Sequence, residues 1–301
     1  MATMKTLNGY GFNATELNGK PSNSYLQKTD TASDSAKLGG KAPEYYLQPR
    51  NPLDNSDFRN PVNQRGIYSA ANGSHIIDRW LFYNSNFTGN VTITQNANGI
   101  TITNDAGADT VAVVQKFIDK SYYDGKYTVV VKTTDGLVFG YTETMDSENG
   151  IAQASIWLPS GTTAVWAALY EGSYTAETLP PYVPKGYAAE LAECRRYFYK
   201  MKSHWKWVSA GICETSTKAF IPIVLPREMR IVPTVSITNP SLIKVKCGSI
   251  GLQIPSNIKW TYGILGARIM QMAATVTGAT GGDVAFLYFD DGGEITFSAD
   301  L

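Results

Sequence analysis

The clearest alternation of apolar and polar residues lies between positions 90 and 104. Asn90-Val-Thr-Ile-Thr-Gln95 and Ile100-Thr-Ile-Thr-Asn104 alternate apolar and hydroxyl residues on either side of the turn at 96–99, which holds Asn and Gly. Two such runs around a short turn are a strong signal for a β-hairpin. The residues expected to face a core are Val91, Ile93, Ile100 and Ile102.

More runs of β-branched and aromatic residues follow, separated by Asp-Gly, Asn-Gly and Pro-Ser-Gly turns. They span 111–118, 126–133, 136–144, 151–158 and 163–170. Seven or eight short strands within about 120 residues are typical of a two-sheet sandwich. The turn-rich segment 51–66 is expected to be a linker into this sandwich, and the prolines of 180–184 to close it. We therefore expect one β-domain over residues 51–185.

One stretch has helical periodicity. Within 187–201, Leu191, Cys194, Phe198 and Met201 recur at spacings of three and four, which predicts a single connecting α-helix. The strand-like runs after it are 205–213, 218–225, 234–238, 243–245, 269–277 and 284–290.

The last of these runs is followed by Asp290-Asp-Gly-Gly293 and then by a further short run, Glu294-Ile-Thr-Phe297. Such turn residues predict a hairpin that pairs 284–289 with 294–297. The helix and these strands together predict a second, C-terminal β-rich domain over residues 186–301.

Residues 1–50 are polar and contain a repeat at a spacing of 21 residues. Leu17-Asn-Gly-Lys20 with Tyr25-Leu-Gln27 recurs as Leu38-Gly-Gly-Lys41 with Tyr46-Leu-Gln48. Two repeats with so few apolar residues cannot offset an ordering cost of about 1 to 2 kcal/mol per residue. We expect an attachment segment that needs partner chains, with a short helix at 30–38; a disordered N-terminus is the alternative.

Charge and cysteine content narrow the class of protein. Lys plus Arg and Asp plus Glu both number 26, so no field of one sign exists to attract nucleic acid. The start lacks the apolar region of a signal peptide, and no run approaches the roughly 20 apolar residues that span a bilayer, so no membrane insertion is expected. The expected state of the cysteines is three buried thiols: Cys194, Cys213 and Cys247.

Catalytic chemistry finds little support. The two histidines, His75 and His204, each adjoin a serine in sequence, but adjacent residues do not form a Ser-His pair, and no Gly-x-Ser-x-Gly elbow is present. Most carboxylates that a glycosidase or a calcium site would use lie in turns, and this placement favours turn chemistry. The candidate carboxylates are Asp78, Asp119, Asp124, Asp290, Asp291 and Glu294. We expect no enzyme, no cofactor and no metal.

Aromatic residues are the better candidates for ligand binding. Asp78 and Trp80, in Ile77-Asp-Arg-Trp80, would suit a surface platform for a sugar, although a structural Trp with an Asp-Arg pair is the favoured alternative. Trp205 and Trp207 fall on one face of a strand, where they either fill a core or form an exposed patch. Trp260 and Tyr262 have the same spacing and are expected to join that surface.

Several phrases resemble phage tail-fibre and receptor-binding (tip) proteins from prophages of Gram-positive bacteria. The Leu-x-Gly-Lys-x4-Tyr-Leu repeat is similar to their stalk repeats. Asn51-Pro-Leu-Asp-Asn-Ser-Asp-Phe-Arg-Asn-Pro-Val-Asn-Gln-Arg-Gly66, with 77–80, resembles the start of their carbohydrate-binding-module-like jelly roll. The segments 168–175, 189–198 and Leu225-Pro-Arg-Glu-Met-Arg-Ile-Val-Pro-Thr-Val235 resemble the end of that domain, the helix and their terminal domains.

The resemblance implies a mainly β protein: an attachment or stalk segment, a central jelly-roll β-sandwich, one connecting α-helix and a C-terminal β-sandwich knob. It also implies a homotrimer in the virion, assembled in the host cytoplasm and joined through residues 1–50 to other tail or baseplate proteins. Such a protein would adhere to a host surface glycan, teichoic acid or related wall polymer. The alternatives are a structural tail or collar decoration protein and a polysaccharide-depolymerising tailspike.

Overall fold

The computed structural model describes residues 51–118, 127–146, 148–202, 206–248, 250–262 and 268–301, with the backbone alone at 261–262. Nearer the N-terminus it describes only an antiparallel backbone pair, β1 (Glu16–Leu17) with β2 (Lys20–Pro21). The rest of the attachment segment, including the helix expected at 30–38, lies outside the described residues. The chain divides into two compact units, Arg50–Tyr174 with Tyr182–Leu301 and Met1–Pro49 with Thr175–Pro181.

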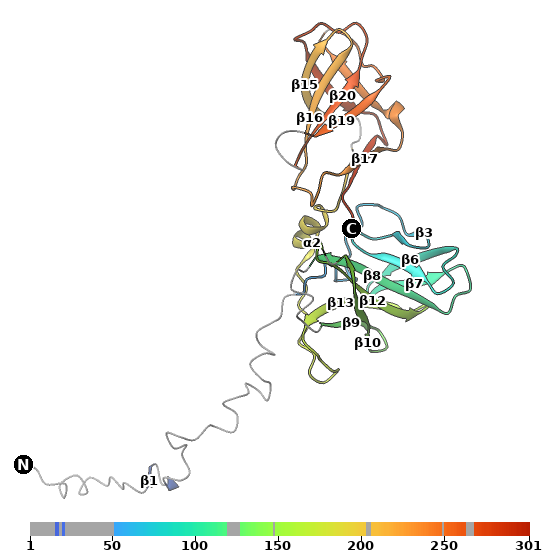
Figure 1. The fold of residues 1–301 in the computed structure, drawn as a ribbon, viewed down its shortest axis with the longest axis vertical. Helices are drawn as coiled ribbons and strands as arrows, with labels where there is room; N and C mark the ends of the chain where they lie inside the picture. Colours follow the sequence, from blue (N-terminus) through green and yellow to red (C-terminus); the bar gives the residue numbers. More distant parts are fainter. Residues whose placement is uncertain are drawn as a thin grey trace, which may run out of the picture. The chain divides into compact units, whose positions relative to one another are not determined.

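The fold is mainly β, and its first sandwich is a jelly roll of two antiparallel sheets (Figure 1). The six-stranded sheet has the order β10-β9-β13-β7-β6-β3 and the five-stranded sheet the order β11-β12-β8-β5-β4. The bounds in the six-stranded sheet are β3 Ser69–Ala71, β6 Asn90–Asn96, β7 Gly99–Asn104, β9 Tyr127–Thr133, β10 Leu137–Phe139 and β13 Thr163–Glu171. Those in the five-stranded sheet are β4 Ser74–His75, β5 Leu81–Asn84, β8 Thr110–Ile118, β11 Tyr141–Asp146 and β12 Ile151–Pro159.

One hydrophobic core joins the two sheets of this sandwich. The predicted hairpin is confirmed: β6 pairs with β7 in a register that sets Ile93 opposite Ile102, and all four expected core residues are buried. The segment 51–66 is more than a linker, because Leu53 and Phe58 are fully buried in the same core. The Asn51 side chain also hydrogen-bonds the backbone of β13 at Ala167 and Leu169.

The strand predicted at 136–144 is two strands in different sheets. β10 pairs with β9, whereas β11 pairs with β12, and Gly140 lies between them. A Cβ atom at Gly140 would come within 2.2 Å of the Ser155 backbone oxygen. The chain crosses from one sheet to the other at the residue that allows this close approach.

The second sandwich lies in residues 198–298 and packs a six-stranded sheet against a three-stranded one around its own core. The strand orders are β18-β21-β15-β16-β20-β19 and β14-β22-β17. The six-stranded sheet has the bounds β15 Lys206–Thr215, β16 Lys218–Val224, β18 Ile243–Cys247, β19 Ile258–Tyr262, β20 Ile269–Thr275 and β21 Val284–Phe289. The three-stranded sheet has the bounds β14 Phe198–Lys202, β17 Thr234–Ile237 and β22 Glu294–Ser298, and a 3-10 turn, η5 Pro240–Leu242, precedes β18.

The connecting helix is shorter than its periodicity predicts. Helix α2 spans Tyr187–Cys194 and follows Gly186, whose φ is 82°. Phe198 begins strand β14, which pairs with β22, and the ring of Tyr199 stacks on Phe297 at 6.2 Å. Pairing with β22 overrides the helical spacing, as tertiary contacts often override local propensity. In the described part of the chain, no helix has the length and apolar character to cross a membrane.

The hairpin predicted across 290–293 is wrong. β21 belongs to the six-stranded sheet and β22 to the three-stranded sheet, so the turn joins the two layers. The Asp290 carboxylate lies 2.6 Å from Lys244 Nζ, and its backbone N–H donates to the Leu242 oxygen, which ties the turn to β18. Gly292, with φ 79°, provides the left-handed turn residue.

Candidate functional site

An apolar surface covers the solvent side of the six-stranded sheet in the second sandwich. The strand register sets Trp207 opposite Tyr288, Ala210 opposite Phe286 and Ile212 opposite Val284. These residues alternate with core residues such as Leu287, so they point away from the core. The exposed fractions are 53% for Trp207, 52% for Ile212 and 50% for Val284.

The surface continues onto the neighbouring strand β16. Phe220 lies opposite Ile212, and Val224 is 61% exposed. Below, "the outer face" denotes this set: Trp207, Ala210, Ile212, Phe220, Pro222, Val224, Val284, Phe286 and Tyr288. A monomer rarely leaves so many neighbouring apolar side chains exposed without a partner.

Aromatic rings gather at one end of the outer face. The Trp207 ring meets Tyr288 at 4.9 Å and Phe286 at 5.6 Å between centroids, in edge-to-face arrangements at 63° and 65°. A register shift between Trp207 and Ser209 marks a bulge beside the cluster, and bulges re-aim side chains. We call these three rings the aromatic cluster.

Lysines border the outer face. On edge strand β18, Lys244 lies opposite Tyr288 and Lys246 opposite Phe286. On the other edge strand, β19, Lys259 lies opposite Ala273. Lys218 Nζ sits 4.4 Å from the centroid of the Phe220 ring. The arrangement therefore offers flat rings for stacking and ammonium groups for hydrogen bonds to oxygen ligands.

Trp260 does not join this surface, so that expectation is wrong. It pairs with buried Met272, and its ring meets Phe297 of the three-stranded sheet at 5.8 Å, so it points to the opposite side of the sheet from Trp207. There it borders a separate groove of about 380 Å³ with Val235, Ile237 and Pro255. Trp205 lies outside the described residues, as does the side chain of Tyr262.

Trp80 and Asp78 lie in the interior of the first sandwich. Trp80 is fully buried, its Nε1 donates to the Asn55 oxygen at 2.9 Å, and its ring contacts Phe58 edge-on at 5.2 Å. No exposed ring face remains for a sugar to stack on, which fits the structural alternative for this Trp. Asp78 is also fully buried and accepts a hydrogen bond from Gln64 at 2.6 Å.

A charged network surrounds Asp78. Arg65 lies 3.8 Å from Asp78 and forms a 2.6 Å ion pair with Asp300, which also lies 3.9 Å from His75. Burial raises the pKa of Asp78 to about 6 against the pull of Gln64 and Arg65. Burial lowers the pKa of His75 to about 4, although Asp300 opposes this shift. The network ties β4 and the loop before β3 to Asp300 near the end of the chain.

A second network holds helix α2 against the first sandwich. The Glu190 carboxylate accepts from the backbone N–H groups of Asn55 at 2.6 Å and Ser56 at 3.2 Å. Burial raises the pKa of Glu190. Asn55, with φ 55°, also bonds the Val62 backbone in both directions, so its side chain fixes the loop that receives the helix.

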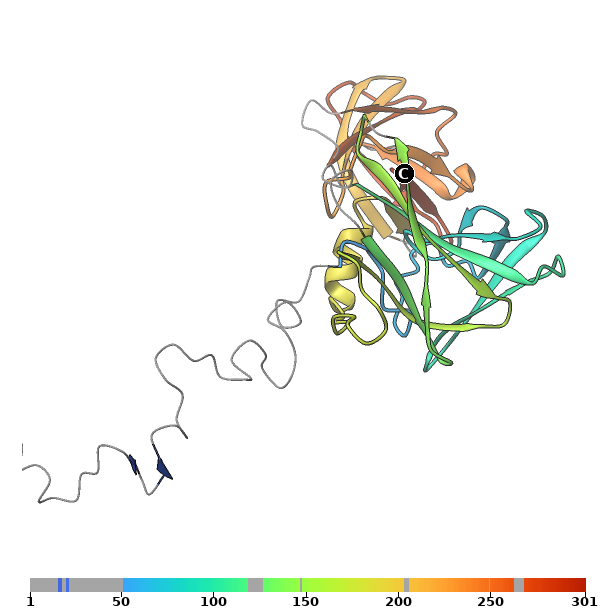
Figure 2. The same ribbon diagram turned by 60° about the horizontal axis from the view of Figure 1, so that its bottom comes forward.

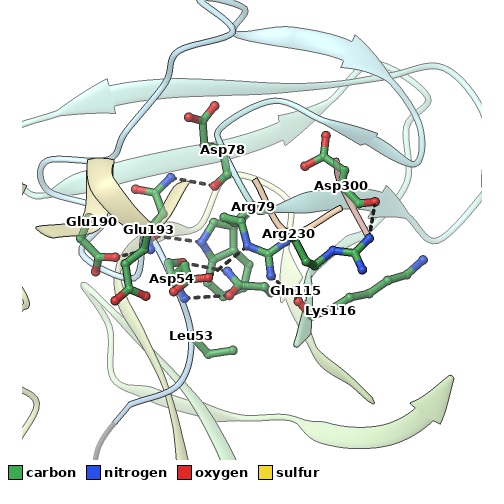
Figure 3. Close-up of polar contacts among 12 residues, drawn as sticks. Leu53, Asp54, Asp78, Arg79, Gln115, Lys116, Glu190, Glu193, Arg230 and Asp300 are labelled. Atoms are coloured by element: carbon green, nitrogen blue, oxygen red, sulfur yellow. Dashed lines mark hydrogen bonds and ion pairs between the residues drawn. The ribbon is translucent and has the colours of Figure 1, made fainter. Parts of the chain in front are cut away.

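Arg79 and Asp54 form the centre of this second network, as Figure 3 shows. Arg79 Nε donates to Asp54 at 3.2 Å, Nη2 donates to the Lys116 oxygen at 2.6 Å, and the guanidinium lies 3.4 Å from the Tyr197 ring centroid. Gln115 bonds both backbone groups of Asp54 at 2.8 Å. The sequence offered only the neighbouring Asp78-Arg79 pair, whereas the structure pairs Arg79 with the distant Asp54.

The described members of the carboxylates considered for acid chemistry or calcium form no metal-binding group. Asp290 is paired with Lys244, and Glu294 accepts from Thr238 at 3.0 Å and lies 3.6 Å from Lys200. Asp119 and Asp124 lie outside the described residues. Across the part of the chain that the structure describes, no three His, Cys, Asp or Glu side chains form a group suited to a metal ion.

The chain was compared with protein families, curated proteins and solved structures. No protein-family model matches the chain, and neither the curated proteins nor the solved structures contain a match.

Proposed function

We propose that this chain is a receptor-binding protein of a phage or phage-tail-like particle that adheres to a host cell-surface glycan or related wall polymer. The outer face carries this proposal, because a large exposed apolar patch with clustered rings is typical of an interaction surface. The tail-fibre phrases in the sequence add support. Binding, rather than turnover, is the activity proposed.

The aromatic cluster is the proposed contact with the receptor. Ring faces of Trp207 and Tyr288 suit the apolar side of a sugar ring, and Lys244 and Lys246 beside them suit hydroxyl or phosphate oxygens. A flat site of this kind binds one sugar unit weakly. A homotrimer, joined to the tail or baseplate through residues 1–50 in the virion, would multiply that affinity through avidity.

Binding of the full-length protein to isolated Gram-positive cell walls tests the proposal. Removing a stacked Trp commonly costs about 2 kcal/mol or more, so Trp207→Ala should weaken binding roughly thirtyfold or more. Tyr141→Ala in β11 is the matched control, because Tyr141 is a similarly exposed aromatic at 49%. This control should bind like the natural chain.

Two further measurements separate the alternatives. If Trp207→Ala leaves wall binding intact but lowers the oligomeric mass in analytical ultracentrifugation, the outer face is a subunit contact and the proposed receptor site is wrong. If the natural chain binds no wall preparation, a structural decoration role replaces adhesion. Release of soluble sugar from the walls would instead indicate a depolymerising tailspike.

A further inference from the structure

A cavity of about 430 Å³ lies beside helix α2, within the compact unit that contains both sandwiches. Its walls come from the loop before the jelly roll at Asp54, the end of β8, the start of β9 at Tyr127, the end of β13 at Glu171 and the turn after the helix at Arg196. This volume is in the lower part of the usual range for small-molecule sites. Room for a small ligand is therefore available.

One wall of the cavity is rigid and charged. Arg79 and Asp54 are both nearly buried, and their mutual hydrogen bond, the Lys116 oxygen and the Tyr197 ring fix the guanidinium in place. Arg79 also has φ 74°, a left-handed conformation that costs a non-glycine residue energy and is common at binding sites. A wall held this firmly loses little freedom when a ligand binds.

Two further charged side chains, Glu171 and Arg196, line the cavity. Glu171 and Arg196 are exposed, and neither side chain makes a hydrogen bond or ion pair within the described residues. They also do not pair with each other, although both line the same cavity. One is an acceptor and the other a donor, so a ligand that both donates and accepts hydrogen bonds satisfies the two together.

The balance of charges selects the ligand class. The carboxylate of Asp54 is paired with Arg79 and Lys185, and that of Glu193 is paired with Lys185. The charges left facing the cavity are those of Glu171 and Arg196, one of each sign, so an ion of either sign would meet a like charge. Neutral hydroxyl groups face no such penalty.

Apolar lining completes the match. Phe117, Ile118 and Tyr127 lie side by side at the cavity, and the Phe117 and Tyr127 rings are 6.2 Å apart. Aromatic rings pack against the C–H face of a pyranose while its hydroxyl groups reach the polar wall. We propose that this cavity binds one or two sugar units of a neutral glycan, with Glu171 and Arg196 bonding hydroxyls and Tyr127 supporting the ring.

This site is separate from the outer face, and the proposal holds whether or not the outer face binds a receptor. The test is saturation-transfer difference NMR on the full-length protein with a panel of neutral probes: the methyl glycosides of glucose, galactose, mannose and rhamnose, N-acetylglucosamine and N-acetylgalactosamine. We expect at least one probe to receive saturation. Arg196→Ala and Glu171→Gln should each weaken its binding roughly tenfold, since hydrogen bonds to charged groups are the stronger class.

Matched controls locate the effect. Arg227→Ala and Glu143→Gln change exposed residues of the same types that do not line the cavity. Both should keep sugar binding unchanged. Because Glu171→Gln preserves shape at an exposed position, it remains informative if Arg196→Ala perturbs folding.

Two results would overturn the proposal. One is the absence of any probe binding at millimolar sugar, and the other is binding that the cavity variants leave unchanged. Glycerol phosphate is the anionic probe, and if the cavity variants weaken its binding while no neutral sugar binds, the assigned ligand class is refuted.

Discussion

The pKa values of Asp78 and His75 are shifted in opposite directions beside the Arg65–Asp300 ion pair. This allows a sharp test of the network. The perturbations are two single substitutions, Asp78→Asn and His75→Gln, each of which removes one titrating group while keeping a polar side chain of similar size. We expect them to change the pH dependence of the free energy of unfolding with opposite slopes.

Asp78 makes the folded protein less stable as pH rises. Its pKa is raised from 3.8 to about 6, chiefly by burial, so the folded state keeps a proton that the unfolded chain has already released. The stabilisation is complete below pH 3.8 and is lost as pH rises through about 6. A shift of about two units corresponds to about 3 kcal/mol.

His75 acts in the other direction. Its pKa is lowered from 6.5 to about 4, again chiefly by burial. Between these pH values the unfolded chain binds a proton that the folded protein does not bind. The stabilisation is complete above pH 6.5 and is lost as pH falls through about 4. Its size is also about 3 kcal/mol, so the two contributions nearly cancel in the natural chain.

Urea unfolding of the natural chain and both variants between pH 4 and pH 7 measures the effect. The free energy of unfolding of Asp78→Asn minus that of the natural chain should rise by about 3 kcal/mol across this range, and the difference for His75→Gln should fall by a similar amount. Titrating groups outside the network of Arg65, His75, Asp78 and Asp300 drop out of these differences. Slopes of the same sign, or an NMR titration of His75 centred near 6.5, would refute the reasoning.

Two further outcomes follow from packing. Gly140→Ala should destabilise the first sandwich by about 2 kcal/mol in urea unfolding because its Cβ would overlap the Ser155 oxygen, whereas Gly136→Ala, with no neighbour within 4 Å, should change stability by less than about 1 kcal/mol. The three buried cysteines should resist a thiol reagent at pH 8 until urea unfolds the chain, because burial raises the pKa of Cys194 and Cys247; rapid modification of the folded protein would contradict this.

Local pattern was sufficient for the elements in which neighbours in sequence are also neighbours in space. The hairpin of β6 and β7 is one such case, because its turn residues and its alternation point to the same register. The wrong predictions concern strands whose pairing partners lie far away along the chain. The spacing of Phe198 and Met201 suits a helix, yet β22, about 95 residues further on, provides their partner.

The charged residues beside helix α2 show why the sites were harder to predict. Asp54 and Arg79 are unremarkable in the sequence, and their ion pair depends on an entry loop that folds into the core. Glu190 looks like an ordinary exposed helix residue, but it is buried because it accepts two backbone N–H groups of that loop. A cluster of side chains assembled from such distant segments has no characteristic spacing that could be recognised in the sequence.

The outer face, in contrast, was partly readable from strand β21. Val284-Ala-Phe-Leu-Tyr-Phe289 is a continuous apolar run, and such runs are typical of strands buried on both faces. Ala285, Leu287 and Phe289 face the core, whereas Val284 and Phe286 face solvent in the isolated chain. A strand with buried-strand composition and one uncovered face is best explained by a partner that covers that face, which is why the proposed receptor contact was assigned to it.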